Sequence, residues 1–337
     1  MKHYFKSLLL MAILFFNMTA SISIGAIQTD KITSVHIKQD IRQLSDTAKI
    51  TLPRKAYVST QGKVNSLEEK NLLDVLNVGD VVTVALGYDD DNQTEFQGYV
   101  SNLGADAPLV IECEDEMWQL KQTNYNHLFE SVSLAELLSF IAPNYDYEII
   151  DDISLGKFLI ENESAYDVFM RLKNEYLLYS YFVGKTLTVG FASSISPAIR
   201  HTYHNTKNVK DASRLKFVRA ADVRKQIKAI SINKDGSKET VSVGTSGGVT
   251  RTLHYQDKTK EQLKVLAQSA FDSLSFDGLQ GTVKGFGLPR VRAGESLHYI
   301  DPNDLHKEGV YIVESVGIQF SKSTGFQRVV KPYKKIL

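Results

Sequence analysis

The chain has 337 residues, of which 43% are hydrophobic and 23% charged, and its basic and acidic residues balance at 39 each. This apolar content excludes an intrinsically disordered protein, and the length favours two or three packed units over one domain. Residues 198–337 hold 24 Lys and Arg against 13 Asp and Glu, whereas residues 1–197 hold 15 against 26. Such asymmetry either steers subunits together or belongs to two ordinary solvated surfaces. The single cysteine excludes an internal disulfide and mildly favours an intracellular origin.

The first 17 residues place two lysines before a short apolar run at 8–16, which is the layout of a signal peptide. The run is too short to span a bilayer as a helix, which needs about 20 apolar residues. Residues 15–24 also alternate as the first strand of a fold would, and cleavage after Ala26 would remove that strand. Residues 1–17 are therefore either an apolar leader or an extension upstream of a later start.

Residues 18–122 are expected to form a first β-barrel domain. Segment 46–53 alternates with the period of a strand, so that Ala48, Ile50 and Leu52 share one face. Further strands surround an acidic turn between residues 78 and 120, and many short strands with Gly and Asp turns are typical of a barrel.

Two serines stand three residues before a glutamate at the start of an apolar helical stripe, the spacing of a capping box. The first, Ser66, predicts a short helix over 66–76. The second, Ser133, predicts a helix within the next region. A further helix over 164–176, with strands on either side, completes an α+β insert domain at 123–197.

Residues 198–337 return to a strand pattern and are expected to form a second β-barrel domain with one helix. A hairpin at 225–244 turns at an Asp-Gly pair, and apolar residues recur at helical spacing over 259–276. Residues 309–337 are predicted to form a final hairpin with a basic tail. The predicted fold class is thus α+β, mainly β, with two similar small β-barrel domains and an α+β insert between them.

Two short matches suggest that the barrels are duplicated. "VGDVVTVAL" at 78–86 and "AGESLHYID" at 293–301 both introduce a strand with a glycine and an acid. Each is followed by a strand that opens with a glycine and an aromatic residue nearby, and these glycines are Gly98 and Gly309. A repeated unit with these glycines aligned is the resulting hypothesis.

No catalytic, cofactor-binding or metal-binding residue is predicted. The closest histidine pair, His201 and His204, has no neighbouring ligands, which favours a surface position over metal binding. The glycine-rich segment 244–251 lacks the residues of a phosphate loop, and the acids of 89–91 lack the alternate spacing of a calcium loop. Cys113 has no recognisable catalytic partner, so we expect no enzymatic activity.

Three glutamates, Glu112, Glu114 and Glu116, stand at alternate positions, which on a strand would put their carboxylates on one face. A catalytic pair would need a partner from another segment, and the sequence identifies none. A solvated strand face is the ordinary interpretation of this stripe.

Five stretches match one family in order and spacing and are spread over most of the span 18–337; they lie at 44–55, 78–103, 108–122, 164–190 and 309–336. They resemble the baseplate hub proteins of contractile phage tails, the phage late control protein D family. This family is related to the hub domain of type VI secretion spike proteins. Each stretch encodes strands and turns, so the resemblance depends on their combination.

The resemblance implies a homotrimer in which two barrels per chain form a ring of six similar units, adapting a sixfold tail tube to a threefold central spike. Its implied partners are the tube protein, a separate spike protein, other baseplate proteins, and DNA that passes through the channel without specific binding. Glu112, Glu114 and Glu116 would line this channel. The edges and basic tail of the 309–337 hairpin would contact other subunits, tube or spike.

No cofactor is implied, and the expected location is a virion or injection particle assembled in the bacterial cytoplasm, which a leader does not fit. The alternative is an exported β-rich protein that binds a glycan or peptide after its signal peptide is cleaved. A cell-wall hydrolase is disfavoured, because no acid and nucleophile are paired in the sequence.

Overall fold

The computed structural model of the chain describes residues 17–59 and 67–337, and its largest sheet has fifteen strands. Seven come from the first third of the chain: β1 (Met18–Ile24), β2 (Ile27–Thr29), β3 (Ser34–Asp40), β4 (Thr47–Leu52), β7 (Val81–Tyr88), β8 (Asp91–Leu103) and β9 (Leu109–Glu114). Eight come from the last third: β15 (Arg200–His204), β16 (Val209–Asp211), β17 (Lys216–Val218), β21 (Gly278–Gln280), β22 (Val283–Phe286), β23 (Ser296–Ile300), β24 (Gly309–Ser321) and β25 (Gly325–Lys335). The chain is therefore mainly β, as its sequence predicts.

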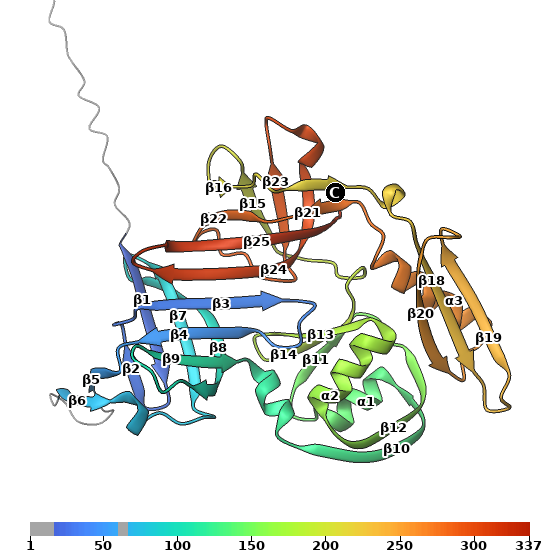
Figure 1. Ribbon diagram of the computed structural model, residues 1–337, viewed down its shortest axis with the longest axis horizontal. Helices are drawn as coiled ribbons and strands as arrows, with labels where there is room; N and C mark the ends of the chain where they lie inside the picture. Colours follow the sequence, from blue (N-terminus) through green and yellow to red (C-terminus); the bar gives the residue numbers. More distant parts are fainter. Residues whose placement is uncertain (1–16, 60–66) are drawn as a thin grey trace, which may run out of the picture.

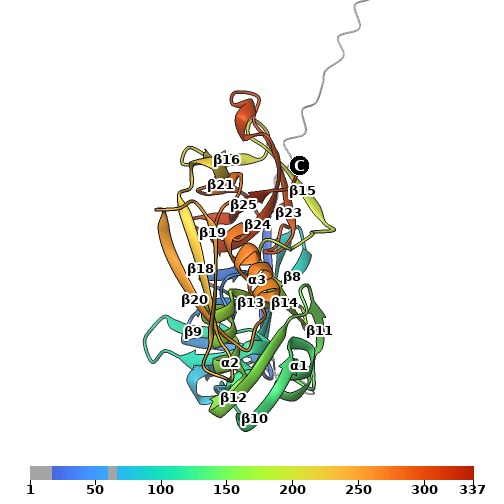
Figure 2. The ribbon, with the colours of Figure 1, turned by 90° about the vertical axis from the view of Figure 1, so that its right-hand side faces the viewer.

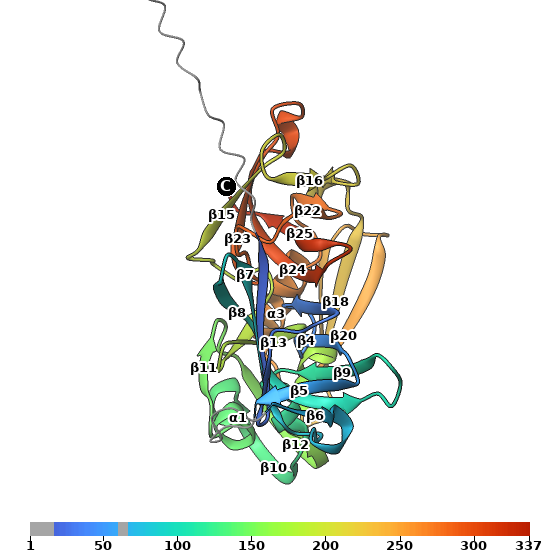
Figure 3. The ribbon, with the colours of Figure 1, turned by 90° about the vertical axis from the view of Figure 1, so that its left-hand side faces the viewer.

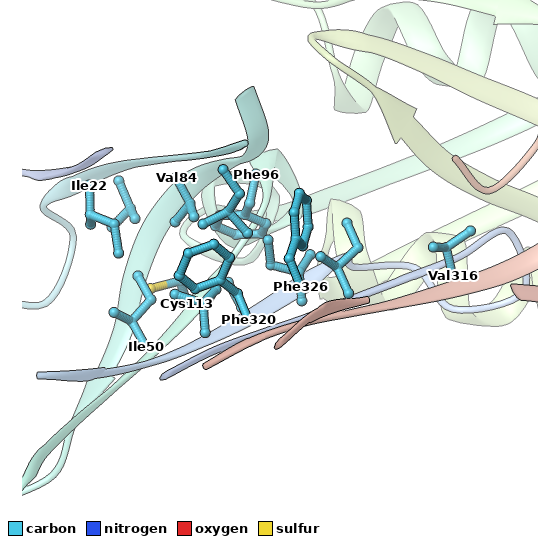
Figure 4. Close-up of a cluster of buried hydrophobic side chains, with 14 of the residues drawn as sticks. Ile22, Ile50, Val84, Phe96, Cys113, Val316, Phe320 and Phe326 are labelled. Atoms are coloured by element: carbon cyan, nitrogen blue, oxygen red, sulfur yellow. The ribbon is translucent and has the colours of Figure 1, made fainter. Parts of the chain in front are cut away.

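The two ends of the chain meet in the middle of this sheet (Figure 1). Its main path runs β16-β22-β25-β24-β3-β4-β9-β8-β7-β1-β2. The junction is the antiparallel pair β3–β24, in register from Asp40 opposite Ser315 to Ser34 opposite Ser321. One hydrophobic core consequently combines residues of both thirds; those labelled in Figure 4 are Ile22, Ile50, Val84, Phe96, Cys113, Val316, Phe320 and Phe326.

The start of the fold bears on the two interpretations of the N-terminus. Residues 1–16, which hold nearly all of the predicted leader, lie outside the described residues. From Met18 the chain forms β1, which pairs with β7 from Met18 opposite Tyr88 to Ile24 opposite Val82. Cleavage after Ala26 would remove this strand from the main sheet.

The helix predicted over 66–76 is wrong for the residues that the structure describes, which begin again at 67. They form β6 (Leu67–Asn71), a strand paired with β5 (Lys55–Ser59), and then the 3₁₀ turn η1 (Leu72–Asp74). A helix of about ten residues has a costly nucleus, whereas the hairpin gives hydrogen-bond partners on β5 to the alternate residues of β6 whose backbone groups face it. The proposed cap, Ser66, lies outside the described residues.

The predicted insert forms two small sheets around two helices. Its elements are η2 (Glu116–Lys121), β10 (Asn124–Ser133), α1 (Leu134–Ile141), β11 (Asp146–Ile149), β12 (Ser154–Ser164), α2 (Ala165–Arg171), the π-helical turn η3 (Leu172–Tyr176), β13 (Leu178–Val183) and β14 (Thr186–Phe191). Ser133 caps α1 in a reciprocal capping box with Glu136, as predicted, and Ser164 does the same for α2 with Asp167. The β10–β12 ribbon and α1 lie at the end of the molecule away from β16 (Figure 3).

Residues 225–272 form a separate layer instead of joining the main sheet. β18 (Lys225–Ile232), β19 (Lys238–Gly244) and β20 (Val249–Gln256) make a three-stranded sheet, and α3 (Lys260–Asp272) packs against β18 and β19 (Figure 2). A short 3₁₀ turn, η4 (Ala220–Asp222), precedes this layer, and another, η5 (Leu305–Lys307), connects β23 to β24. Ile227 and Leu263 of this layer share a buried cluster with Leu137 and Phe169 of the insert. The hairpin and helix that the sequence assigned to the second barrel thus share the insert's core.

Candidate functional site

A strand meander occurs twice in the main sheet with the same backbone geometry. Before β7, Gly79 donates a hydrogen bond to the Val100 carbonyl at 2.8 Å, and the Val100 amide donates to Asp80 at 2.9 Å. Before β23, Gly294 and Glu295 make the same two bonds with Val313, at 2.9 and 2.8 Å; this residue takes the place of Val100. Both glycines have positive φ, 92° and 85°, a conformation that glycine adopts without steric cost.

The match continues through the central strand of each meander. β8 has a register shift between Val100 and Asn102 where it pairs with β9, and β24 has one between Val313 and Ser315 where it pairs with β25. A bulge at the same position in both copies bends the two strands alike. The repeat predicted from the sequence is therefore present locally, as the pair of meanders β7–β8–β9 and β23–β24–β25.

The alignment of Gly98 with Gly309 is wrong by two residues. Val82 stands three positions after Gly79 and pairs with Gly98. Its equivalent in the other meander, Leu297, stands three positions after Gly294 and pairs with Tyr311 instead of Gly309. The two positions require glycine for different reasons. A Cβ on Gly98 would lie 2.1 Å from the Glu114 carbonyl oxygen, and one on Gly309 would lie 2.4 Å from the Lys335 side chain.

The final hairpin does not offer free edges, so the expectation that its edges contact other subunits is wrong. β24 pairs with β3 and β23 on the side away from β25, and β25 pairs with β22 and β21. The basic tail also folds back on its own chain, because Lys334 Nζ donates to the Ser193 carbonyl at 3.0 Å and Lys335 Nζ to that of Glu308 at 2.8 Å.

A buried arginine ties the two halves of the main sheet together. Arg328 of β25 is 0% exposed and pairs with the carboxylate of Glu95 on β8. Its Nε donates to the Gly287 carbonyl at 2.7 Å, and its Nη1 to the Val291 carbonyl at 3.4 Å. The sequence pattern marks Arg328 only as a charged residue inside an apolar strand, and Glu95, 233 residues away, carries no signal at all.

The acidic stripe is split between two environments. Glu112 and Glu114 lie on β9, where Glu112 is exposed and pairs with Lys49 at 3.4 Å, and Glu114 pairs with Lys121. The expectation that Glu116 shares their face is wrong, because β9 ends at Glu114 and η2 begins at Glu116.

The Glu116 carboxylate is instead buried and held by two tyrosines. It accepts hydrogen bonds from the hydroxyls of Tyr99 at 3.2 Å and Tyr145 at 3.0 Å. Burial raises the pKa of both tyrosines, and the nearby carboxylate raises it further. Glu116 thus joins the main sheet to the insert.

Two further carboxylates, Asp46 and Asp115, lie near each other where β4 begins and β9 ends. Asp115 accepts hydrogen bonds from Ser45 Oγ at 2.9 Å, from the Asp46 amide at 3.0 Å and from the Met117 amide at 3.1 Å. Burial raises the pKa of Asp115 to about 6. The pKa of Asp46 is also raised, first by burial and then by the charge of Asp115. The pair therefore favours holding a proton.

These carboxylates line a cavity of about 440 Å³ that lies between the main sheet and the insert. Strands of the first third contribute Gln39 and Glu95, the insert contributes Tyr181 and Thr188, and the second meander contributes Arg292. All three parts of the chain thus meet around one cavity.

The residues weighed for catalysis or metal binding have ordinary structural surroundings. His201 pairs with Glu295 at 2.8 Å, and the His204 ring accepts from the Thr206 amide at 3.3 Å. Cys113 is buried, which raises the pKa of its thiol to about 12 and keeps it protonated. Within residues 17–59 and 67–337, no three His, Cys, Asp or Glu side chains gather closely enough to hold a metal ion. In the same ranges no helix is long and apolar enough to cross a membrane.

Comparison with known proteins gives matches in structure only. No family model matches the chain, and no curated protein matches it. A tail protein from Neisseria meningitidis is 15% identical, with a TM-score of 0.66 over 94% of this chain and 96% of that one. The 43 kDa tail protein of prophage MuSo2 from Shewanella oneidensis is 16% identical, with a TM-score of 0.59 over 94% and 98%.

A third similar structure is an Escherichia coli component of the type VI secretion system, described as structurally similar to tail proteins of bacteriophage T4. It is 8% identical, with a TM-score of 0.55 over 93% of this chain and 77% of that one. The chain therefore has the fold of phage tail proteins and of a type VI secretion component along nearly its whole length.

Proposed function

We propose that this chain is a structural protein of the baseplate hub of a contractile tail, or of a phage-derived injection system. In this role it forms a homotrimer that adapts a sixfold tail tube to a threefold central spike. The fold that it shares with tail proteins supports the class of particle. The observation that carries the finer proposal is the meander that occurs twice with one register and one bulge.

Symmetry explains why such a repeat would be useful. Three chains with two similar units each present six similar units, and equal contacts between chains close into a ring by rotation. The function would then reside in shape and contact, with tube, spike and other baseplate proteins as partners in a virion or injection particle. The two barrels, 18–122 and 198–337, are part of this proposal, with residues 225–272 of the second lying outside its sheet as a separate layer.

A difference between the two meanders suggests where neighbouring chains meet. In the second meander Ser296 is buried, and both its amide and its hydroxyl donate to the Ile199 carbonyl at 2.9 Å. The equivalent residue of the first meander, Val81, is 60% exposed, and Val78 close by is 57% exposed. We assign these two valines to the contact with the next chain. A segment of that chain would cover Val81 as the segment at Ile199 covers Ser296 in the second meander.

The acidic residues of β9 have a place in this arrangement. Glu112 and Glu114 would face the channel, where carboxylates repel the phosphates of passing DNA and prevent specific binding. Glu116 is buried and adds no charge to that surface. The alternative of an exported glycan-binding or peptide-binding protein is less well supported, since cleavage after Ala26 would delete β1.

Native mass spectrometry and electron microscopy, with and without the neighbouring spike protein, test the proposal. We expect a particle of three 37.8 kDa chains and a ring with six similar lobes. Val78→Asp with Val81→Asp should reduce the trimer, whereas Val249→Asp, at an exposed valine of β20, should leave it intact. A protein that stays monomeric at all concentrations, with the spike present, would refute the hub role. Glycan binding by that monomer would favour the exported alternative.

A further inference from the structure

The two ends of the molecule carry charges of opposite sign. The segment 198–224, which holds β15, β16 and β17, has seven Lys and Arg against two Asp and Glu. The insert, 123–197, has ten acidic residues against four basic ones. Figures 2 and 3 show β16 and the β10–β12 ribbon at opposite ends of the molecule, so neither excess is neutralised by the other within one chain.

Cations at the basic end lie beside exposed apolar side chains. All seven Lys and Arg side chains of 198–224 are exposed, and none forms an ion pair within the described part of the chain. Lys210 Nζ lies 4.4 Å from the ring centre of Phe286, and burial together with the charge of Lys284 lowers the pKa of Lys210. Phe286 and Leu288, two residues apart at the end of β22, are both exposed. The basic end therefore combines cations that have no acidic partner with apolar surface.

The acidic end has the same arrangement with the opposite charge. Leu128 of β10 and Leu159 of β12 lie directly opposite each other in the ribbon, and both are exposed. Glu161, two positions after Leu159 and on the same face of the strand, is exposed and forms no ion pair among the described residues. Glu130 has Lys157 as its partner, at 4.0 Å, with both side chains exposed. An apolar centre with a charged rim is the usual anatomy of a protein–protein contact.

We propose that the basic end of one chain docks on the β10–β12 ribbon of a second copy. The exposed apolar residues of the two surfaces meet at the centre of this contact, and the cations of 198–224 face Glu130 and Glu161 at its rim. A second copy supplies both the opposite charge and the apolar pair that the basic end requires. Nucleic acid is a poorer occupant, because a phosphate backbone leaves Phe286 and Leu288 without an apolar partner.

The contact joins two different surfaces, so its repetition by rotation closes a ring. The main sheet supports this direction of repetition, since its strand path begins at β16 on the basic end and reaches β9, after which the chain enters the insert. The inference rests on the proposed homotrimer, to which it adds a contact separate from the one at Val78 and Val81. Opposite charges on the two surfaces also speed the encounter of the chains and make it depend on salt.

Charge reversal in the full chain tests the contact, with the trimer measured by sedimentation velocity at about 50 mM and about 500 mM NaCl. We expect the concentration at which the trimer dissociates to rise about tenfold at the higher salt. Lys210→Glu with Lys216→Glu, and separately Glu130→Lys with Glu161→Lys, should each raise it about tenfold or more. All four changes in one chain restore the attraction with the signs exchanged, so the trimer should return.

Further variants separate this contact from general effects of charge. Lys234→Glu with Lys238→Glu, at the exposed turn between β18 and β19, is the control and should leave the trimer unchanged. Leu128→Ser with Leu159→Ser removes the apolar centre without changing charge and should weaken the trimer about tenfold. All the changed side chains are exposed, so the fold should be retained, which circular dichroism checks.

The outcomes distinguish this contact from the hub role. A trimer that is insensitive to salt and to both charge reversals, or one that the fourfold variant does not restore, would overturn the contact and leave the hub role standing. A trimer that the control variant weakens as much as the reversal at Lys210 and Lys216 would also overturn it. A chain that stays monomeric under every condition would overturn both.

Discussion

Replacing Arg328 with methionine tests how the halves of the main sheet are joined. The substitution keeps an unbranched side chain of similar length but removes the ion pair with Glu95 and the hydrogen bonds to two carbonyls. Glu95 is 2% exposed, so its charge is left in the interior with Arg290, 3.5 Å away, and Arg292 as its cationic neighbours. Breaking a buried pair from one side costs about 3–5 kcal/mol. For a chain of this length that corresponds to a fall of roughly 4–7 °C in melting temperature.

The assay is urea unfolding followed by tryptophan fluorescence and circular dichroism, with calorimetry for the melting temperature. The double variant Glu95→Leu, Arg328→Met removes both charges, and we expect it to recover most of the lost stability, because a well-packed apolar pair often replaces a buried ion pair at no cost. A loss below about 1 kcal/mol in Arg328→Met would place the pair among weak surface ion pairs and refute the reasoning.

Two further predictions concern the meander glycines and the aspartate pair. Gly79→Ala and Gly294→Ala should each lower the free energy of unfolding by about 1–3 kcal/mol, because both need positive φ and the added Cβ would lie 3.1 Å from Trp118 and 3.2 Å from the Tyr181 hydroxyl. Gly317→Ala, whose Cβ would meet nothing nearer than 3.9 Å, is the control, and an equal loss there would contradict the argument. The pKa of Asp115 is raised from 3.8 to about 6, so its contribution to stability is complete below pH 3.8 and is lost as pH rises through 6, a loss of about 3 kcal/mol. Asp46→Asn should therefore gain stability relative to the unmodified chain between pH 4 and pH 7 in urea unfolding, and parallel pH profiles would count against this coupling.

Much of the local structure could be predicted from the sequence, because strand alternation and helix capping depend on residues that are close together in the chain. Ala48, Ile50 and Leu52 alternate in the sequence and are all buried on one face of β4. Ser133 predicted the start of α1 through a capping box that the structure contains. The capping pattern at Ser66 failed because strand pairing with β5 competes for the same backbone groups, and spacing within one segment does not reveal that competitor.

Pairing between distant segments could not be predicted in the same way. Alternation in 309–321 predicts a strand, but it does not show that β3, about 270 residues earlier, lies beside it. For that reason the edges of the hairpin are expected to contact other subunits, whereas both of them pair with strands of the same chain. The two-residue error at Gly98 has a similar cause, since a glycine can be required by a close approach of backbone from elsewhere.

The candidate site was the least predictable part. Glu116 follows Glu112 and Glu114 in sequence spacing, but the strand ends before it and two tyrosines bind its carboxylate. The cavity takes its walls from three regions of the chain, so no single stretch carries its pattern. Arg328 is visible in the sequence only as a charged residue within an apolar strand. The structure explains this charge by the ion pair with Glu95.

The pairing of β3 with β24 has a consequence for the newly made protein. After β3 has been synthesised, the ribosome must add about 270 residues before β24 emerges, which takes about 15–55 s at ordinary rates of translation. Until then β3 presents an unprotected row of amides and carbonyls that is able to recruit the wrong strand. We therefore expect chains truncated before residue 309 to be retained by chaperones, whereas the complete polypeptide becomes soluble after its release.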